Sequence, residues 1–208
     1  MSGRPYVIGL TGNIACGKSA VLTMLADLGA ETFDADRVAH DVMAAGMPTA
    51  ERVIAEFGPG IRTADGGIDR RALGAIVFAD PSRLARLEEL THPPTVAAIR
   101  DRVAASVHAV VVIDAIKLFE AGLAPDCDQV WVVTCDHEQQ LERLMRRNGF
   151  DRREAQQRIN AQPPQEEKVR RADVVINNSG SLYSTAAQVR AAWMALPSQR
   201  RDPVDAPG

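Results

Sequence analysis

Eight residues near the amino terminus have the types and spacing of a phosphate-binding loop. They follow the apolar run YVIGL and match the pattern G-x-x-x-x-G-K-[ST] in full. Glycines let backbone N–H groups approach phosphate oxygens, and a helix that starts here adds partial positive charge. The lysine can reach the β- and γ-phosphates, and the serine hydroxyl can ligate Mg²⁺. The pattern therefore predicts binding of ATP and Mg²⁺ by Gly12, Asn13, Ile14, Ala15, Cys16, Gly17, Lys18 and Ser19.

A tight turn with an incidental lysine is the alternative interpretation of this loop. It is disfavoured because an apolar strand pattern precedes the loop and a helical pattern follows it. The loop alone supports only binding of a nucleoside triphosphate.

Two acids, Asp34 and Asp36, follow the short segment ETF. In an extended chain their carboxylates project on the same side. Beside a nucleotide, one of them could accept the proton of an attacking hydroxyl group. Helix capping explains Asp36 equally well, because the helical pattern RVAHDVMAA comes next. Spacing alone does not separate these two interpretations.

Further charged residues could serve phosphate chemistry. Asp114 ends the run AVVVI, where a carboxylate can hold Mg²⁺ through water; an ordinary strand-end acid is the alternative, and Glu120 is a weaker candidate. Arg143 and Arg147 share one face of a predicted helix that also carries Arg146. An arginine there could stabilise the transferring phosphoryl group. The alternative is a solvated basic helix face, which would be the better interpretation if the sequence had no glycine loop.

Composition narrows the class of protein. The 208-residue chain has a net charge of -3 and a pI near 5.8, which argues against a general nucleic-acid binder. Its three cysteines form no C-x-x-C pair, and its four histidines have no metal-ligand spacing, so we expect neither disulfides nor a histidine metal site. The apolar runs are too short to span a bilayer, and the amino terminus reads as a buried strand. We expect a cytoplasmic protein that binds neither membrane nor nucleic acid.

Strands and helices alternate along the chain. Apolar segments predict strands at 6–10, 31–36, 109–114, 129–135 and 173–177, and helical patterns lie between them and at the end. This alternation predicts an α/β fold with a parallel sheet flanked by helices. Since ligands bind beyond the carboxyl ends of such strands, we expect the glycine loop, the DAD acids and Asp114 to converge on one crevice.

Seven segments, in order, resemble the bacterial dephospho-coenzyme A kinase family over about 7–196. One alone would be weak evidence beyond the glycine loop, but seven in order are specific. They are IGLTGNIACGKS, LGAETFDADRVAH, FG with DGGIDRRALGAIVF, LEELTHP, LFEAGL, RLMRRNGFDRREAQQRINAQ and ADVVINNSGS.

The resemblance implies transfer of the γ-phosphate of ATP to the ribose 3′-hydroxyl of dephospho-CoA, with Mg²⁺, to complete coenzyme A. It also implies a single P-loop kinase domain. The helical pattern of 37–106 without a convincing strand itself predicts a helical insertion, and the polar tail at 197–208 is expected to be disordered. The resemblance implies that the insertion binds the acceptor, with a core at about 5–36, 107–147 and 172–196 and a helical lid at 148–171. A monomer or weak homo-oligomer is expected.

Individual roles follow from the same resemblance. Asp36 matches the family's general base, and Arg147 matches its lid arginine. Asn178 and Gly180 match the adenine-side loop. Residues matched to the region that receives dephospho-CoA are Arg70, His92 and Pro93, with Asp36 at the reacting hydroxyl.

Four residues depart from the family pattern. Cys16 stands where serine is common, and Ala20 where threonine is common; loss of a hydroxyl contact at Ala20 would cost about 1 kcal/mol and raise the KM for ATP. The thiol of Cys16 makes oxidation a means of blocking ATP. In DAIKLFE, Ile116 replaces proline and Lys117 replaces leucine, so Lys117 either contacts a substrate phosphate or faces solvent.

Two other functions remain open on this reading. One is another small-metabolite or nucleoside monophosphate kinase on the same core. The other is a non-catalytic P-loop switch, although the guanine-binding motif N-K-x-D of a GTPase is missing from the sequence.

Overall fold

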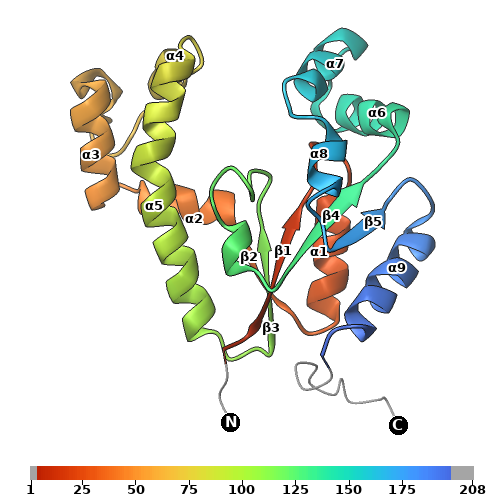
Figure 1. The fold of residues 1–208 in the computed structure, drawn as a ribbon. Helices are drawn as coiled ribbons and strands as arrows, with labels where there is room; N and C mark the ends of the chain where they lie inside the picture. Colours follow the sequence, from red (N-terminus) through yellow and green to blue (C-terminus); the bar gives the residue numbers. More distant parts are fainter. Residues whose placement is uncertain (1–3, 198–208) are drawn as a thin grey trace. The chain divides into compact units, whose positions relative to one another are not determined.

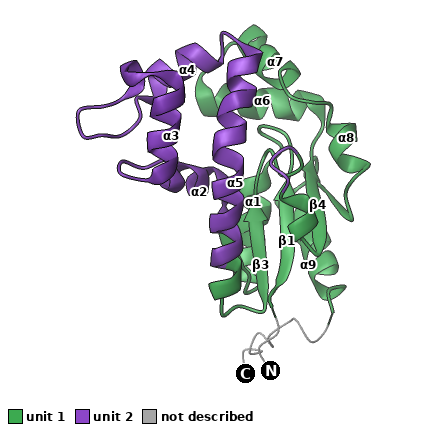
Figure 2. Ribbon diagram, turned by 60° about the vertical axis from the view of Figure 1, so that its left-hand side comes forward, with its two compact units in different colours: residues 1–33, 103–119, 123–208 green, residues 34–102, 120–122 purple. Residues whose placement is uncertain are grey.

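The structure is a computed structural model that describes residues 4–197, which fall into two compact units (Figures 1 and 2). Within the described residues, unit 1 comprises 4–33, 103–119 and 123–197, and unit 2 comprises 34–102 and 120–122. Apart from Pro197, the tail expected to be disordered lies outside the described residues.

A five-stranded sheet forms the centre of unit 1, with the order β2-β3-β1-β4-β5. Strand β1 pairs in parallel with β3 and β4, and β4 pairs in parallel with β5. The central strands are buried on both faces, which is why their sequences are continuously apolar. The strands are β1 (Tyr6–Thr11), β2 (Glu31–Asp34), β3 (Val110–Asp114), β4 (Gln129–Thr134) and β5 (Val174–Asn177).

Helices flank this sheet, as the sequence predicted. Helices α1 (Lys18–Asp27) and α9 (Leu182–Met194) contact each other and pack on one face of the sheet, where Leu10, Trp131 and Trp193 belong to one buried cluster. The remaining elements of this unit are the short η2 (Ala124–Asp126), α6 (His137–Asn148), α7 (Arg152–Asn160) and α8 (Gln165–Val169).

Unit 2 is helical and has its own core. Apolar side chains of α3 meet those of α4, including Phe57, Leu73 and Val77, and Leu90 of α5 joins them. At the Asp65-Gly66-Gly67 turn, Gly66 has a φ of 83°. The helices are α2 (Ala35–Val42), α3 (Pro48–Phe57), η1 (Pro59–Ile61), α4 (Arg70–Val77) and α5 (Pro81–Ala105), the last of which ends in unit 1.

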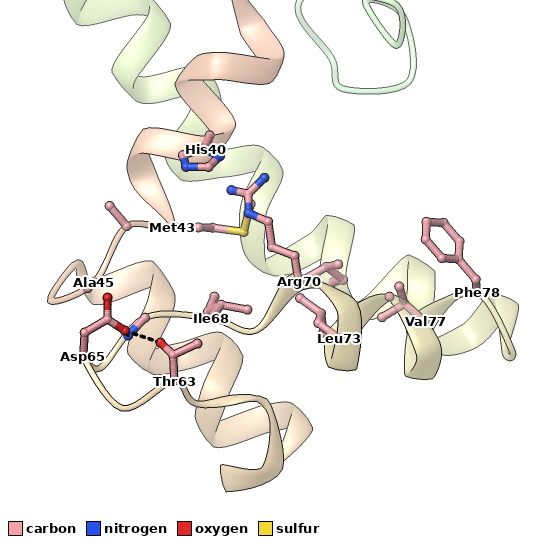
Figure 3. A pocket seen from close by; sticks show the side chains of 14 residues that line it. His40, Met43, Ala45, Thr63, Asp65, Ile68, Arg70, Leu73, Val77 and Phe78 are labelled. Atoms are coloured by element: carbon pink, nitrogen blue, oxygen red, sulfur yellow. Dashed lines mark hydrogen bonds between the residues drawn. The ribbon is translucent and has the colours of Figure 1, made fainter. Parts of the chain in front are cut away.

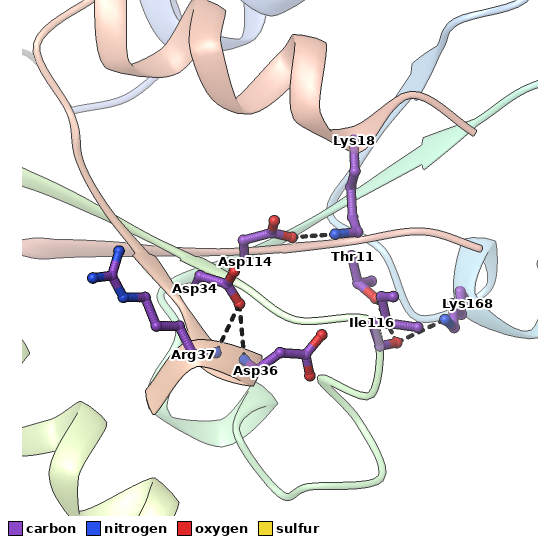
Figure 4. A network of polar contacts seen from close by, with 8 residues as sticks. All are labelled: Thr11, Lys18, Asp34, Asp36, Arg37, Asp114, Ile116 and Lys168. Carbon is purple, nitrogen blue, oxygen red and sulfur yellow. Dashed lines mark hydrogen bonds and ion pairs between the residues drawn. The ribbon is translucent and has the colours of Figure 1, made fainter. Parts of the chain in front are cut away.

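The expected extended conformation of Asp34-Ala35-Asp36 is wrong. Strand β2 ends at Asp34, and α2 begins at Ala35. The Asp34 carboxylate accepts hydrogen bonds from the backbone N–H groups of Asp36, at 2.9 Å, and Arg37, at 3.2 Å (Figure 4). Asp34 is therefore the N-cap, which satisfies two N–H groups that lack helical partners. Asp36 lies in the first turn with an exposed side chain, so capping does not account for its carboxylate.

No helix within residues 4–197 combines the length and the apolar character needed to cross a membrane.

Candidate active site

The glycine loop connects β1 to α1 at the carboxyl end of the strand. Ala15 has a φ of 60°, and among the described non-glycine residues it alone has a positive φ. A Cβ atom at Gly12 would lie 2.5 Å from the carbonyl oxygen of Val133. Such a close approach excludes any side chain at Gly12 and explains the glycine that the pattern requires.

Lys18 and Asp114 form an ion pair in unit 1 (Figure 4). Both side chains are 14% exposed, and Asp114 is the last residue of β3, paired in register with Leu10 of β1. Parallel register therefore brings the lysine of the loop and the strand-end acid together, as expected for the carboxyl edge of the sheet.

A pocket of about 520 Å³ contains much of the loop. The arginines of α6 line it beside the backbone of the loop, while Ile116 lines it from the segment after β3. A concentration of cations beside a phosphate-binding loop suits a polyphosphate. Its lining residues are Asn13, Ile14, Ala15, Gly17, Lys18, Ser19, Ile116, Arg143, Arg146 and Arg147.

Other predicted nucleotide residues do not line this pocket. Asn178 is buried, and its side-chain amide is bonded to the carbonyl of Cys16. Gly180 is exposed and immediately precedes Ser181, whose side chain caps α9. Lys117 is exposed, whereas its neighbour Ile116 is half-buried.

The thiol of Cys16 is fully buried beneath the loop. Burial raises the pKa of Cys16 to about 11, against the smaller opposing effects of a backbone hydrogen bond and the nearby charge of Lys18. Since the thiolate is the reactive form, this environment argues against the oxidation expected from the sequence.

Iodoacetamide should accordingly modify Cys16 slowly in the folded protein at pH 8. A thiol with a pKa near 11 instead of 9.0 has roughly a hundredth of the thiolate, and burial also blocks access. Peptide mass spectrometry with and without urea measures the difference. Equal labelling rates in the two samples would contradict this description of the thiol.

Unit 2 contains a second pocket, of about 510 Å³ (Figure 3). Its lining is mostly apolar, with Met43, Ile68 and Leu73 among the lining side chains. Arg70 supplies a cation, and its guanidinium group is directed toward Met43 and His40. An apolar cavity of this size with few polar groups is typical of a small-molecule site.

Only some of the residues predicted to bind dephospho-CoA line this pocket. Arg70 lines it, but His92 and Pro93 of α5 do not. Asp36 also belongs to unit 2, as does the exposed Glu120.

A family model described as "Dephospho-CoA kinase" matches residues 6–184. The chain belongs to the dephospho-CoA kinase family. It is 48% identical to a curated dephospho-CoA kinase of Carboxydothermus hydrogenoformans, over 88% of this chain and 90% of that protein. It is 47% identical to the one of Symbiobacterium thermophilum, over 91% of this chain and 80% of that protein.

A crystal structure of a Thermus thermophilus protein has a similar fold. It is 33% identical and gives a TM-score of 0.80, over 93% of this chain and 98% of that chain. The α/β architecture predicted from the sequence is thus confirmed for this dephospho-CoA kinase family member.

Sequence reasoning missed His40, which lines the unit 2 pocket with an exposed side chain. None of the four histidines has metal-ligand spacing, and the family resemblance gave a role only to His92. His40 ends the dephospho-CoA kinase segment LGAETFDADRVAH, and this position in the segment was the available signal.

Proposed function

We propose that this protein transfers the γ-phosphate of ATP to the ribose 3′-hydroxyl of dephospho-CoA, which yields coenzyme A and ADP. The observation that carries the proposal is a complete phosphate-binding loop, with cations lining its pocket, in a chain of the dephospho-CoA kinase family. The proposed nucleotide site comprises the eight loop residues from Gly12 to Ser19, of which all but Gly12 and Cys16 line the pocket.

Phosphoryl transfer depends on positioning and on stabilisation of negative charge. Lys18 would turn its ammonium group from Asp114 to the β- and γ-phosphates when ATP binds. Arg147 is exposed at the pocket and would add charge near the transferred group. Asp36 would accept the proton of the ribose hydroxyl group. The family resemblance supports this role, and so does the observation that Asp34, and not Asp36, caps α2.

The oxygen ligands available in unit 1 fit Mg²⁺. Ser19 has an exposed side chain at the start of α1, and Asp114 presents a carboxylate at the end of β3. Hydroxyl and carboxylate oxygens are what Mg²⁺ prefers, and the ion commonly retains several waters, so Asp114 would hold it through water. When bound, Mg²⁺ neutralises charge on the β- and γ-phosphates.

The unit 2 pocket is proposed as the site for the pantetheine arm of dephospho-CoA. Its apolar side chains suit the dimethyl and methylene groups of the arm, and Arg70 suits the adjoining diphosphate. His92, Pro93 and Lys117 remain proposed acceptor contacts on the strength of the resemblance alone.

The protein is further proposed to act in the cytoplasm, as a monomer or weak homo-oligomer. Support for the compartment comes from Cys16, Cys127 and Cys135, which are all free thiols. Free thiols are typical of a reducing environment.

Replacing Arg70 by alanine should raise the KM for dephospho-CoA by roughly tenfold to a hundredfold, because one charge-assisted contact to the diphosphate is lost. The KM for ATP should stay within twofold. The matched control is Arg71→Ala, which removes an exposed cation from the same helix but outside the pocket lining. An unchanged KM for dephospho-CoA in Arg70→Ala would exclude this contact.

The function is tested by coupled detection of ADP with four acceptors: dephospho-CoA, adenosine, AMP and shikimate. We expect turnover with dephospho-CoA and little with the others. Turnover with another acceptor and none with dephospho-CoA would favour a different metabolite kinase, and none with any acceptor would favour a nucleotide switch.

A further inference from the structure

The side chain of Asn178 is almost completely buried, at 3% exposure, and both of its polar atoms are engaged. Its Nδ2 donates to the carbonyl of Cys16 at 2.9 Å, across 162 residues of sequence. Its Oδ1 accepts from the hydroxyl of Thr185, at 2.9 Å, and Thr185 is itself fully buried. Both polar atoms of this buried amide therefore have partners in unit 1, and Asn178 does not line the nucleotide pocket.

Arg143 adds a second link to the same carbonyl. Its Nη1 donates to Cys16 O at 3.4 Å, and its Nη2 donates to the carbonyl of Asn178 at 2.9 Å. The segment after β5, helix α6 and the glycine loop are therefore joined at one carbonyl oxygen, and all three lie in unit 1.

Gly17 shows how closely Asn178 approaches the loop. A Cβ atom at Gly17 would lie 1.9 Å from Nδ2 of Asn178, and the φ of 94° is itself one that favours glycine. The second glycine of the motif thus leaves room for the buried amide.

Holding the carbonyl of Cys16 also fixes the next N–H group. Peptide bonds are planar, and no cis peptide occurs among residues 4–197. In a trans peptide, the C=O of Cys16 and the N–H of Gly17 point in opposite directions. A carbonyl bonded to Asn178 therefore directs the N–H of Gly17 away from that side chain, which does not line the nucleotide pocket, whereas Gly17 does.

We propose that Asn178 is a positioning residue that, braced by Thr185, sets the Cys16–Gly17 peptide so that its N–H group faces the phosphates of ATP. This replaces the expected contact with adenine and rests on the proposed nucleotide site. If the loop is already oriented before ATP binds, less conformational entropy is lost on binding. The contacts of Asn178 with Cys16 and Thr185, here called the brace, therefore raise the affinity for ATP. The acceptor does not touch these groups in the proposed mechanism.

Asn178→Asp is the first test, because it keeps the size of the side chain and an acceptor for Thr185 but removes the donor to Cys16. We expect the Kd for a non-hydrolysable ATP analogue with Mg²⁺, measured by calorimetry without acceptor, to rise at least tenfold. Asn177→Asp adds the same charge at the exposed neighbouring position and should stay within twofold. Equal affinities of Asn178→Asp and wild type would overturn the proposal.

Thr185→Val and Thr185→Ser test the hydrogen bond from Thr185 to Asn178 without a change in charge, and they distinguish its effect on ATP binding from an effect on folding. The valine variant loses the hydroxyl without a change in charge and should weaken binding at least threefold, while the serine variant should bind like wild type. If both variants fold and bind ATP equally, with only the thermal midpoint lowered, Asn178 and Thr185 serve stability alone and the proposal fails. This pair also decides the matter if Asn178→Asp does not fold.

The same titration keeps the two proposals distinct. A wild-type protein that fails to bind the ATP analogue would contradict the proposed function. A wild-type protein that binds it, with variants that bind equally well, would contradict the brace only. In steady-state kinetics, the KM for ATP should rise in Asn178→Asp while the KM for dephospho-CoA stays within twofold.

Discussion

Replacing Lys18 by alanine should lower the turnover number by roughly a thousandfold, because one preorganised charge is removed from the transferring phosphoryl group. Lys18 lines the nucleotide pocket and is only 14% exposed, so its charge acts in a partly dehydrated site. ATP affinity should fall as well, since the ammonium group also attracts the β-phosphate in the ground state.

The Lys18→Ala experiment needs a check on folding, because Asp114 loses its ion-pair partner. Thermal unfolding monitored by circular dichroism supplies that check. Arg153→Ala is the matched control, since it removes an exposed cation of α7 that does not line the nucleotide pocket. Turnover of a folded Lys18→Ala protein within tenfold of wild type would show that the lysine does not stabilise the transferred group.

The second large effect is expected for Asp36→Asn. A carboxylate that accepts the proton of the ribose hydroxyl contributes roughly a hundredfold to ten-thousandfold to the rate, and the amide cannot take this role. The Kd for ATP should remain nearly unchanged, because the proposed role of Asp36 concerns the acceptor. Stopped turnover with intact ATP binding is the expected signature.

Asp34→Asn offers a closely matched control for Asp36→Asn. The substitution also converts one carboxylate of the DAD segment into an amide, but asparagine is as good an N-cap as aspartate, so α2 should keep its start. Turnover should stay within a few-fold of wild type. Near-normal turnover in Asp36→Asn, or an equal loss in both variants, would remove Asp36 from the base role.

Much of the fold could be predicted because it depends on local pattern. The β-branched run before Asp114 reads as a strand buried on both faces, and the glycine spacing after β1 is dictated by the backbone of the loop. Which acid of DAD caps α2 could not be predicted, because it depends on the residue at which the chain leaves the strand. The structure places that point at Asp34.

Contacts between distant segments were also beyond reach of the sequence. Asn178 could be assigned only to the neighbourhood of the nucleotide, since its bond to Cys16 requires α9, β5 and the glycine loop to pack together. The arginines predicted to share one face of α6 likewise differ in their tertiary contacts, which the sequence does not show. Arg143 is bonded to carbonyls of the loop and of Asn178, whereas Arg147 remains exposed at the pocket.

Product analysis tests the central claim most directly. Purified protein is incubated with ATP, Mg²⁺ and dephospho-CoA, and the product is compared with authentic coenzyme A by chromatography, mass spectrometry and phosphorus NMR. We predict one product identical to coenzyme A, with its new phosphate on the ribose 3′-oxygen and ADP formed in equal amount. Release of ADP without this product, or a phosphate on another oxygen, would contradict the account.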